Sequence, residues 1–177
     1  MATSAGLLVS LRLAGKRVLV VGGSQEAESR VFHALECGAI VTVLAPGASL
    51  TPVLKRRIAT NQVSHVDSEF AGDLDHNDNP TTYHLVLGCL DGHDESVDLC
   101  ECARALKIPV NCADVPELCD FFFVAVMREG LLQIGVSTNG GGPRLAARLR
   151  THIQNTLPKG TKEAVSKIAA LRLRVKN

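Results

Sequence analysis

The sequence predicts an α/β protein with a Rossmann-like, doubly wound parallel sheet, followed by a strand-rich dimerisation region and a C-terminal helical arm. Three observations carry this prediction. A continuous apolar run at residues 18–21 is closed by Gly22 and Gly23, as in a buried parallel strand that delivers a loop to a ligand. Strand-like and helix-like segments alternate over residues 17–112. After Asp114 the alternation stops and two apolar strands follow one another.

The first half of the chain supplies the elements of the parallel sheet. Helices are predicted where apolar residues recur at a spacing of three to four, and strands where short apolar runs end at Gly or Pro. The predicted strands cover residues 18–21, 39–44, 63–66, 84–89 and 108–112, and the predicted helices cover residues 25–37, 51–60 and 95–106. In the last helix we expect Val97, Leu99, Ala103 and Leu106 to face the sheet.

The second half has a different pattern. Residues 121–127 and 131–137 are apolar at nearly every position, and the short loop 128–130 suits an antiparallel hairpin. Because a lone hairpin is marginally stable in water, we expect subunits to pair through it. Gly140-Gly141-Gly142-Pro143 then opens a helix, and residues 163–175 form a last, basic helix.

Composition and charge narrow the range of partners. With 46% apolar residues, 3% aromatic residues and no Trp, the core must be aliphatic, and stacking on nucleic-acid bases has few candidate side chains. Residues 143–177 contain nine Lys and Arg residues and one acid, a balance of +8, which leaves −7 for the rest of a chain of net charge +1. The basic arm is either a solvated helical surface or a surface that meets an anionic substrate.

The cysteines and histidines indicate neither disulfides nor a permanent metal site. The six cysteines are scattered, contain no Cys-x-x-Cys pair and are typical of reduced core thiols. No His-x-x-x-His pair occurs, and Cys100 and Cys102 lie two apart in a predicted helix, where their side chains diverge. The N-terminus has no basic segment before its short apolar run, and no run reaches membrane-spanning length. We therefore expect a cytoplasmic protein that binds neither a membrane nor nucleic acid.

The loop after the first strand predicts nucleotide binding. It reads Gly22-x-Ser24-x-x-Ala27, where the dinucleotide fingerprint has Gly, Gly and Gly or Ala. Ser24 replaces a glycine that lets the backbone approach the pyrophosphate, although its hydroxyl can donate to a phosphate oxygen. At the end of the second strand, residues 44–47 contain no Asp, Glu or Arg. The residues that usually distinguish NAD from NADP are therefore absent from this position.

A carboxylate follows the fifth predicted strand. Residues 111–116 read Asn-Cys-Ala-Asp-Val-Pro, which places Asp114 at the carboxyl edge of the sheet, where open α/β folds bind ligands. This carboxylate can move a proton or hold a metal ion, and the alternative is a solvated Asp in a turn.

Four stretches together resemble the precorrin-2 dehydrogenase / sirohydrochlorin ferrochelatase family of sirohaem biosynthesis. They are residues 20–23, residues 111–116, the two apolar strands and residues 136–150, and they keep the family's order over essentially the whole chain. The resemblance implies NAD-dependent oxidation of precorrin-2 to sirohydrochlorin. In bifunctional members it also implies insertion of Fe²⁺ in the same cleft, with Fe²⁺ as a substrate. It further implies a homodimer interlocked through the middle strands and the C-terminal helices.

The resemblance also assigns site residues. Asp114 corresponds to the family's functional aspartate, a general acid/base or chelation residue, and Thr138 corresponds to a serine that is phosphorylated in some relatives. The predicted nucleotide contacts are Gly22, Gly23, Ser24, Gln25, Glu26, Leu44, Ala45, Pro46, Gly47, Cys89, Leu90 and Asp91. The predicted substrate contacts are Asn111, Thr138, Asn139, Gly140, Arg144 and Arg148. The chain departs from the family pattern at Ser24, where a third glycine is usual, and at Leu90, where many members have Thr.

The negative charge of the expected substrate gives the basic arm, residues 143–177, a role in this interpretation. Precorrin-2 is a polyanion, and the glycine-rich start of the helix at Pro143 offers unpaired backbone N–H groups beside Arg144 and Arg148. Each carboxylate at such a helix start would gain about 0.3–1 kcal/mol.

The resulting division is an NAD-binding Rossmann domain over residues 1–114, dimerisation strands over 115–142 and a basic helical region over 143–177. Two alternatives stay open, a chelatase that needs no NAD and a non-enzymatic dimer that binds a nucleotide or a tetrapyrrole.

Overall fold

The computed structural model describes residues 6–74, 83–113 and 115–175 of the 177-residue chain. The chain divides into two compact units, residues 10–121 and residues 1–9 with 122–177. We call the first the sheet unit and the second the strand–helix unit, and each is described by itself.

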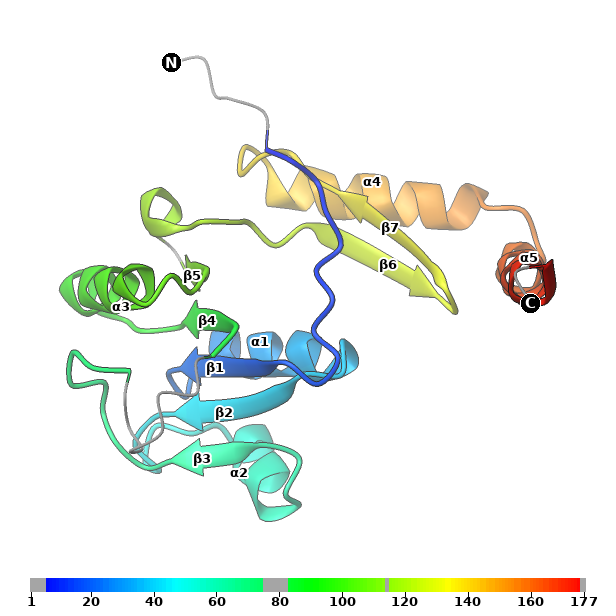
Figure 1. The fold of residues 1–177 in the computed structure, drawn as a ribbon. Coiled ribbons are helices and arrows are strands. Elements are labelled where there is room, and N and C mark those ends of the chain that lie inside the picture. Colours follow the sequence, from blue (N-terminus) through cyan, green and yellow to red (C-terminus); the bar gives the residue numbers. More distant parts are fainter. Residues whose placement is uncertain (1–5, 75–82, 114, 176–177) are drawn as a thin grey trace. The chain divides into compact units, whose positions relative to one another are not determined.

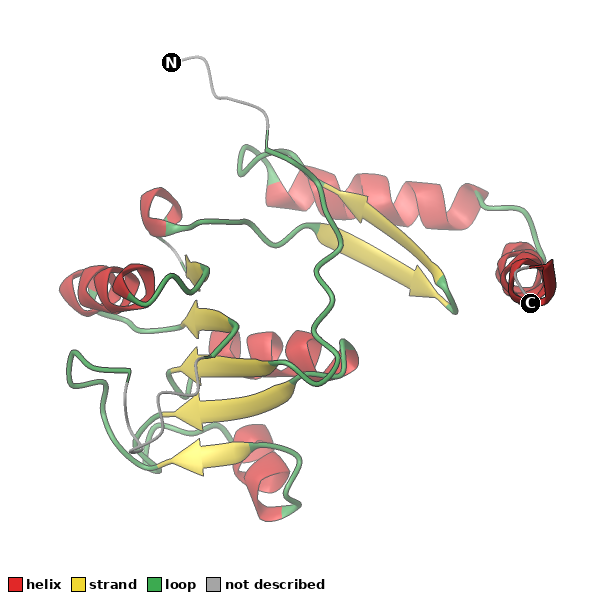
Figure 2. Ribbon diagram, viewed as in Figure 1, coloured by secondary structure: helices red, strands yellow, loops and turns green. Residues whose placement is uncertain are grey.

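The sheet unit is built on five parallel strands in the order β3-β2-β1-β4-β5 (Figure 1). All five arrowheads point to the same edge of the sheet (Figure 2). The strands are β1 Arg17–Val21, β2 Ile40–Leu44, β3 Ser64–Val66, β4 Leu85–Gly88 and β5 Val110–Cys112. The helices are α1 Gln25–Glu36, α2 Pro52–Ala59 and α3 His93–Ala105. This order of strands is that of the Rossmann fold, so the predicted fold class is confirmed.

Two aliphatic cores cover the two faces of the sheet. Val18 and Val20 of β1 pack with apolar residues of α1 and α2, whereas Leu19 and Val21 pack with apolar residues of α3. These four side chains are at most 1% exposed, which explains why β1 is apolar at successive positions instead of alternating.

The buried face of α3 differs in part from the sequence prediction. The residues that face the sheet are Ser96, Leu99, Cys100 and Ala103, at helical spacing. Leu106 was expected to join them but is 50% exposed, because the helix ends at Ala105 and Leu106 is its C-cap residue.

The strand–helix unit contains an antiparallel hairpin, β6 Ala125–Glu129 and β7 Leu132–Val136, and the helices α4 Pro143–Thr156 and α5 Thr161–Val175 (Figure 2). Glu129 pairs with Leu132, so the turn is Gly130-Leu131, and Gly130 supplies the positive φ of 62° that it needs. The hairpin is shorter than expected at its start. Phe121 packs against the core that α1 and α2 cover, and the sheet unit ends at this residue.

α4 contacts both strands of the hairpin. Its apolar residues are only partly covered, since Ala146 is buried whereas Leu145 and Leu149 are exposed. In the part of the chain that the structure describes, no helix has the length and the apolar run needed to cross a bilayer.

Candidate nucleotide site at the carboxyl edge of the sheet

The loops after β1 and β4 meet where the order of the strands reverses. β1 and β4 are neighbours, but the helices that follow them cover opposite faces of the sheet, which is the arrangement that opens a ligand crevice. Gly22 lies at this point of the sheet edge with a φ of 120°, and a Cβ there would collide with the carbonyl group of Cys89. The Cys89 N–H donates to the Val21 carbonyl at 2.7 Å. Gly22 is therefore required by the close approach of two loops.

The turn after β2 is held against the same loop. The Gly22 N–H donates to the Leu44 carbonyl at 2.9 Å, and the Thr51 N–H donates to the Gly23 carbonyl at 3.1 Å. A Cβ on Gly23 would lie 2.7 Å from the Ser49 carbonyl oxygen. The predicted contacts Gly22 and Gly23 are thus brought together with those of the turn, Leu44, Ala45, Pro46 and Gly47.

Ser24 is the N-cap residue of α1. Its Oγ accepts from the Ala27 N–H at 3.4 Å, and its backbone is extended, with φ −72° and ψ 178°. Accepting this bond uses an oxygen lone pair and leaves the hydroxyl hydrogen available to a phosphate. Among the described residues, the backbone N–H groups of Gln25 and Glu26 have no hydrogen-bond acceptor, as expected in a first helical turn. This helix start can accept an anion.

Two carboxylates in the first turn of α1 have partners of their own. Glu26 forms an ion pair with Arg30 at 2.6 Å. Glu28 accepts a hydrogen bond from the Thr51 hydroxyl at 2.8 Å, and the same Oγ1 accepts from Leu54 N–H at 3.2 Å to cap α2. These partners partly offset the negative charges that would repel a phosphate at this helix start. The glycine loop and the helix start at this edge of the sheet therefore fit a dinucleotide.

The loop after β4 also lies at this edge. Cys89 is buried, Leu90 is half-buried and Asp91 is exposed, directly before Gly92, the N-cap residue of α3. All twelve predicted nucleotide contacts therefore lie in one unit, at the ends of β1, β2 and β4 and in the first turn of α1.

Asp114 lies outside the described residues, but the residues on both sides of it are held firmly. The Ala113 N–H donates to the Gly88 carbonyl at 2.9 Å. On the other side, the Cys119 thiol approaches the carbonyl oxygens of Cys112 and Val115 at 3.1 and 3.4 Å. Val115 is 8% exposed and precedes a short 3-10 helix, Pro116–Leu118.

After that helix the chain returns along β5. The Val110 N–H donates to Asp120 Oδ2 and the Asp120 N–H donates to the Val110 carbonyl, both at 2.9 Å. Asn111 Nδ2 donates to the Phe121 carbonyl at 2.8 Å and contacts Cys119 Sγ at 3.2 Å. Asn111 is 5% exposed, so its amide fixes the course of the chain around the end of β5.

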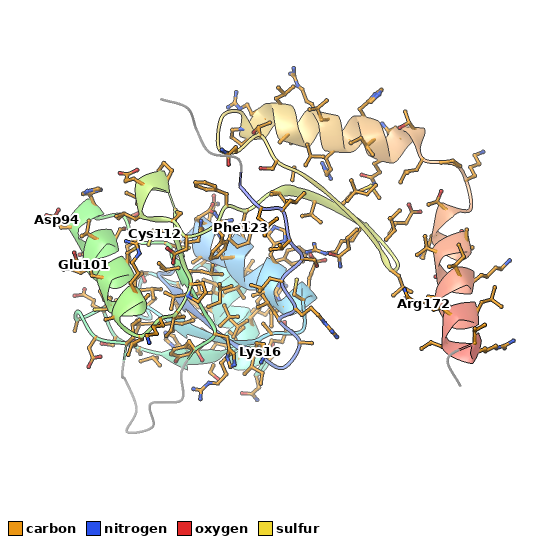
Figure 3. All side chains as sticks on the ribbon, turned by 45° about the horizontal axis from the view of Figure 1, so that its top comes forward. Lys16, Asp94, Glu101, Cys112, Phe123 and Arg172 are labelled. Atoms are coloured by element: carbon orange, nitrogen blue, oxygen red, sulfur yellow. The ribbon has the colours of Figure 1, made fainter. Side chains whose placement is uncertain are left out.

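Two of the thiols near this edge are buried and resist ionisation. Burial raises the pKa of Cys89 from its ordinary value of 9.0 to about 12, and the positive charge of Arg30 opposes this only in part. Burial, followed by the hydrogen bond with Cys100, also raises the pKa of Cys112. The Cys100 and Cys112 sulfur atoms lie 3.1 Å apart as free thiols (Cys112 is labelled in Figure 3). These thiols are therefore poor nucleophiles. Within the described ranges, no three His, Cys, Asp or Glu side chains are grouped so as to hold a metal ion.

The remaining predicted substrate contacts lie in the strand–helix unit. Thr138 closes the turn before α4, since its hydroxyl accepts from the Gly142 N–H at 3.0 Å and its carbonyl accepts from the Gly141 N–H at 2.9 Å. Asn139 and Gly140 follow with positive φ values of 51° and 81°. Arg144 and Arg148 are exposed one turn apart on α4, and neither forms a salt bridge with a described residue.

One carboxylate at the edge of the sheet was not predicted. Asp67 Oδ1 accepts from the Gly47 N–H at 2.6 Å, beside the turn where the sequence shows no acid. In the sequence Asp67 directly follows the predicted strand 63–66, but its place beside the turn depends on the parallel pairing of that strand with strand 39–44.

Family models match most of the chain. A putative NAD(P)-binding model matches residues 9–125, and a model for the central part of a sirohaem biosynthesis protein matches residues 129–156.

Similar proteins agree with these models. Siroheme biosynthesis protein met8 of Schizosaccharomyces pombe is 38% identical over 171 residues, which are 97% of this chain and 63% of that protein. The siroheme synthase of Gluconobacter oxydans is 34% identical over 159 residues, which cover 86% of this chain and 32% of that protein. This chain thus spans less than two thirds of either relative.

A solved structure of a precorrin-2 dehydrogenase, SirC, matches 95% of this chain and 79% of its own, with a TM-score of 0.71 and 21% sequence identity. The two proteins share a fold. The chain belongs to the family of the NAD(P)-binding model that matches residues 9–125, and its relatives are proteins of siroheme biosynthesis.

Proposed function

We propose that this protein is an NAD-dependent dehydrogenase that oxidises precorrin-2 to sirohydrochlorin in sirohaem biosynthesis. The observation that carries the proposal is the carboxyl edge of the Rossmann sheet, where the glycine loop and the start of α1 meet the end of β4, next to the fixed ends of the segment that contains Asp114. The names of the relatives, a siroheme biosynthesis protein and a siroheme synthase, support the pathway.

The proposed reaction removes two electrons and two hydrogens from the macrocycle. When NAD⁺ is bound, its nicotinamide ring supplies the acceptor for one of these hydrogens as a hydride. The start of α1 would hold the pyrophosphate through the backbone N–H groups of Gln25 and Glu26 and the hydroxyl of Ser24. Asp114 takes the other hydrogen as a proton and passes it to solvent. Both hydrogens are then accounted for, and NADH is the second product.

Substrate binding is assigned to basic and small residues. Precorrin-2 is a polyanion, and the exposed side chains of Arg144 and Arg148 project from the first two turns of α4. Thr138, Asn139 and Gly140 form the turn before that helix, and Asn111 positions the segment that leads to Asp114.

A second candidate reaction is the insertion of Fe²⁺ into sirohydrochlorin. Siroheme, which the relatives are named for, is an iron complex, and a macrocycle must lose two N–H protons when Fe²⁺ enters. Asp114 is a base suited to that step as well, with Fe²⁺ as a substrate and not as a resident metal.

We further propose that the protein is a homodimer joined through the strand–helix unit. Helix α5 has no buried residue in the described chain, and Ile168, Leu171 and Leu173 are 58–69% exposed. Faces of this kind are covered by association with another surface.

The cytoplasm is the compartment we propose, because free thiols as close as Cys100 and Cys112 fit a reducing environment.

The proposal is tested with purified protein and precorrin-2. We expect NADH to appear on addition of NAD⁺, and Asp114→Ala to abolish this while circular dichroism and sedimentation stay unchanged. Full turnover by Asp114→Ala would remove this residue from the mechanism.

Incubation with sirohydrochlorin and Fe²⁺ or Co²⁺, with and without NAD⁺, separates the alternatives. Metal insertion without any oxidation of precorrin-2 would identify a chelatase only. Binding without either reaction would identify a non-enzymatic carrier.

A further inference from the structure

We propose that Asp67 selects NAD over NADP at this site. The inference rests on the proposed nucleotide site. It concerns the adenosine ribose of the dinucleotide, where the sequence did not distinguish NAD from NADP. In Rossmann domains an acidic residue at the end of the second strand binds the 2′-hydroxyl of the adenosine ribose, or an Arg nearby accommodates a 2′-phosphate. In this chain the stretch from Leu44 to Thr51 contains no acid and no Lys or Arg.

The neighbouring strand delivers a carboxylate to that position. β3 pairs with β2 in parallel, with Val66 opposite Leu44, so the residues that follow the two strands emerge side by side (Figure 1). The Ala45 N–H donates to the Val66 carbonyl at 3.2 Å, and the His65 ring forms a hydrogen bond of 2.8 Å with the Ala45 carbonyl. These bonds fix the two strand ends against each other just before Asp67.

The carboxylate itself is bound to the turn. Asp67 Oδ1 accepts from the Gly47 N–H at 2.6 Å, and a Cβ on Gly47 would lie only 3.3 Å from Asp67 Oδ2. A side chain at position 47 would therefore crowd the carboxylate, and glycine leaves it room. Asp67 is exposed, and its Oδ2 has no hydrogen-bond donor among the described residues, so one oxygen of a held carboxylate remains available.

The turn that carries this carboxylate is also tied to the phosphate loop. The Gly22 N–H donates to Leu44, and the Thr51 N–H donates to Gly23, so both ends of the turn are anchored beside the start of α1. A dinucleotide with its pyrophosphate at that helix start places its adenosine ribose over the end of β2. Asp67 is the acid at that point.

The charge of Asp67 gives the selectivity. A carboxylate accepts a hydrogen bond from the 2′-hydroxyl of NAD, but it repels the 2′-phosphate of NADP. Two like charges a few ångströms apart repel each other near a protein surface, so we expect NAD⁺ to bind about tenfold more tightly than NADP⁺. After the turn that follows β2, the next basic residue in the sequence is Lys55, which lies beyond the first residues of α2.

The test is a pair of calorimetric titrations, with NAD⁺ and with NADP⁺, of the wild-type chain and of Asp67→Asn. Asparagine keeps an oxygen that can accept from the Gly47 N–H, so the fold is preserved while the charge is lost. We expect the variant to gain about tenfold in NADP⁺ affinity relative to NAD⁺. The matched control is Glu101→Gln, which removes one exposed acid from α3 (Figure 3) and should leave the ratio unchanged.

A second measurement needs no variant. Because Asp67 is exposed, its repulsion of a 2′-phosphate is screened by salt, and the preference of the wild-type chain for NAD⁺ should narrow as ionic strength rises from about 0.01 M to about 1 M.

The outcomes separate this inference from the proposed function. Tight NAD⁺ binding with an unchanged NAD⁺ to NADP⁺ ratio in Asp67→Asn, or a wild-type preference for NADP⁺, overturns the role of Asp67 and leaves the dehydrogenase proposal standing. No binding of either nucleotide by the wild-type chain overturns both.

Discussion

The two units of this protein bury their apolar side chains to very different degrees. The sheet unit has two aliphatic cores, and side chains such as Leu19 and Leu54 are at most 1% exposed. In the described part of the strand–helix unit, the buried apolar side chains are Met127 and Ala146, while the leucines of α5 are exposed. The sheet unit therefore holds itself together, whereas the strand–helix unit leaves most of its apolar side chains at least partly exposed.

The difference also separates two kinds of chemistry. The sheet unit contains all six cysteines and the glycine loop, and its hydrogen bonds join loops from distant parts of the sequence. The strand–helix unit carries most of the excess basic charge, on α4 and α5. Stability and nucleotide binding are thus expected to depend on the first unit, and association and the binding of an anionic substrate on the second.

The largest effect should come from a cavity in the sheet unit. Leu19→Ala removes a side chain that is 1% exposed, and we expect it to lower the free energy of unfolding by about 2–5 kcal/mol. Leu171→Ala removes the same atoms from α5, where Leu171 is 58% exposed, and should change that free energy by less than about 0.5 kcal/mol. Urea unfolding, at a concentration where sedimentation finds monomers, measures both. Equal losses would contradict the comparison.

A smaller effect is expected at the crevice. Gly22→Ala forces a Cβ toward the Cys89 carbonyl at a φ of 120°, which should cost about 1–3 kcal/mol in strain and weaken NAD⁺ binding. Gly15→Ala is the control, because Gly15 also has a positive φ, 69°, but no atom lies within 4 Å of its added Cβ. Thermal unfolding and NAD⁺ titration of the two variants should separate crowding from backbone strain. If Gly22→Ala binds NAD⁺ like the control, the two loops do not need this close approach.

The smallest effect is a loss of stability at alkaline pH, confined to the unit that holds the cysteines. The pKa of Cys89 is raised from 9.0 to about 12, so the folded state keeps a proton that the unfolded state releases. The stabilisation is complete below pH 9 and is lost as pH rises toward 12, at about 1.4 kcal/mol per pH unit for one such thiol. Urea unfolding at pH 8 and pH 10 should show this slope in the wild-type chain and a shallower slope in Cys89→Ala. An identical slope in both would remove Cys89 as its source.

The sequence by itself determined the elements and their order. Residues 18–21 are apolar at every position because both faces of β1 are covered. Ser24 and Thr51 mark helix starts through bonds to residues three positions away, and Pro52 fills the first position of α2. Such signals are local, so they can be read along the chain. The hairpin was found but not its start, because Phe121 accepts a hydrogen bond from Asn111, ten positions away, and packs against the core of the sheet unit.

Only the tertiary structure decided which groups the loops contact at the edge of the sheet. Gly22 and Gly23 were predicted to admit a phosphate, yet they are also required by the carbonyl groups of Cys89 and Ser49, which are distant in sequence. The missing acid at the end of β2 is replaced from β3, since Asp67 reaches Gly47 across twenty positions of sequence. Local patterns specify strands and caps, but the choice of partner at the edge of a parallel sheet follows from the register between strands, and that register exists only once the sheet has formed.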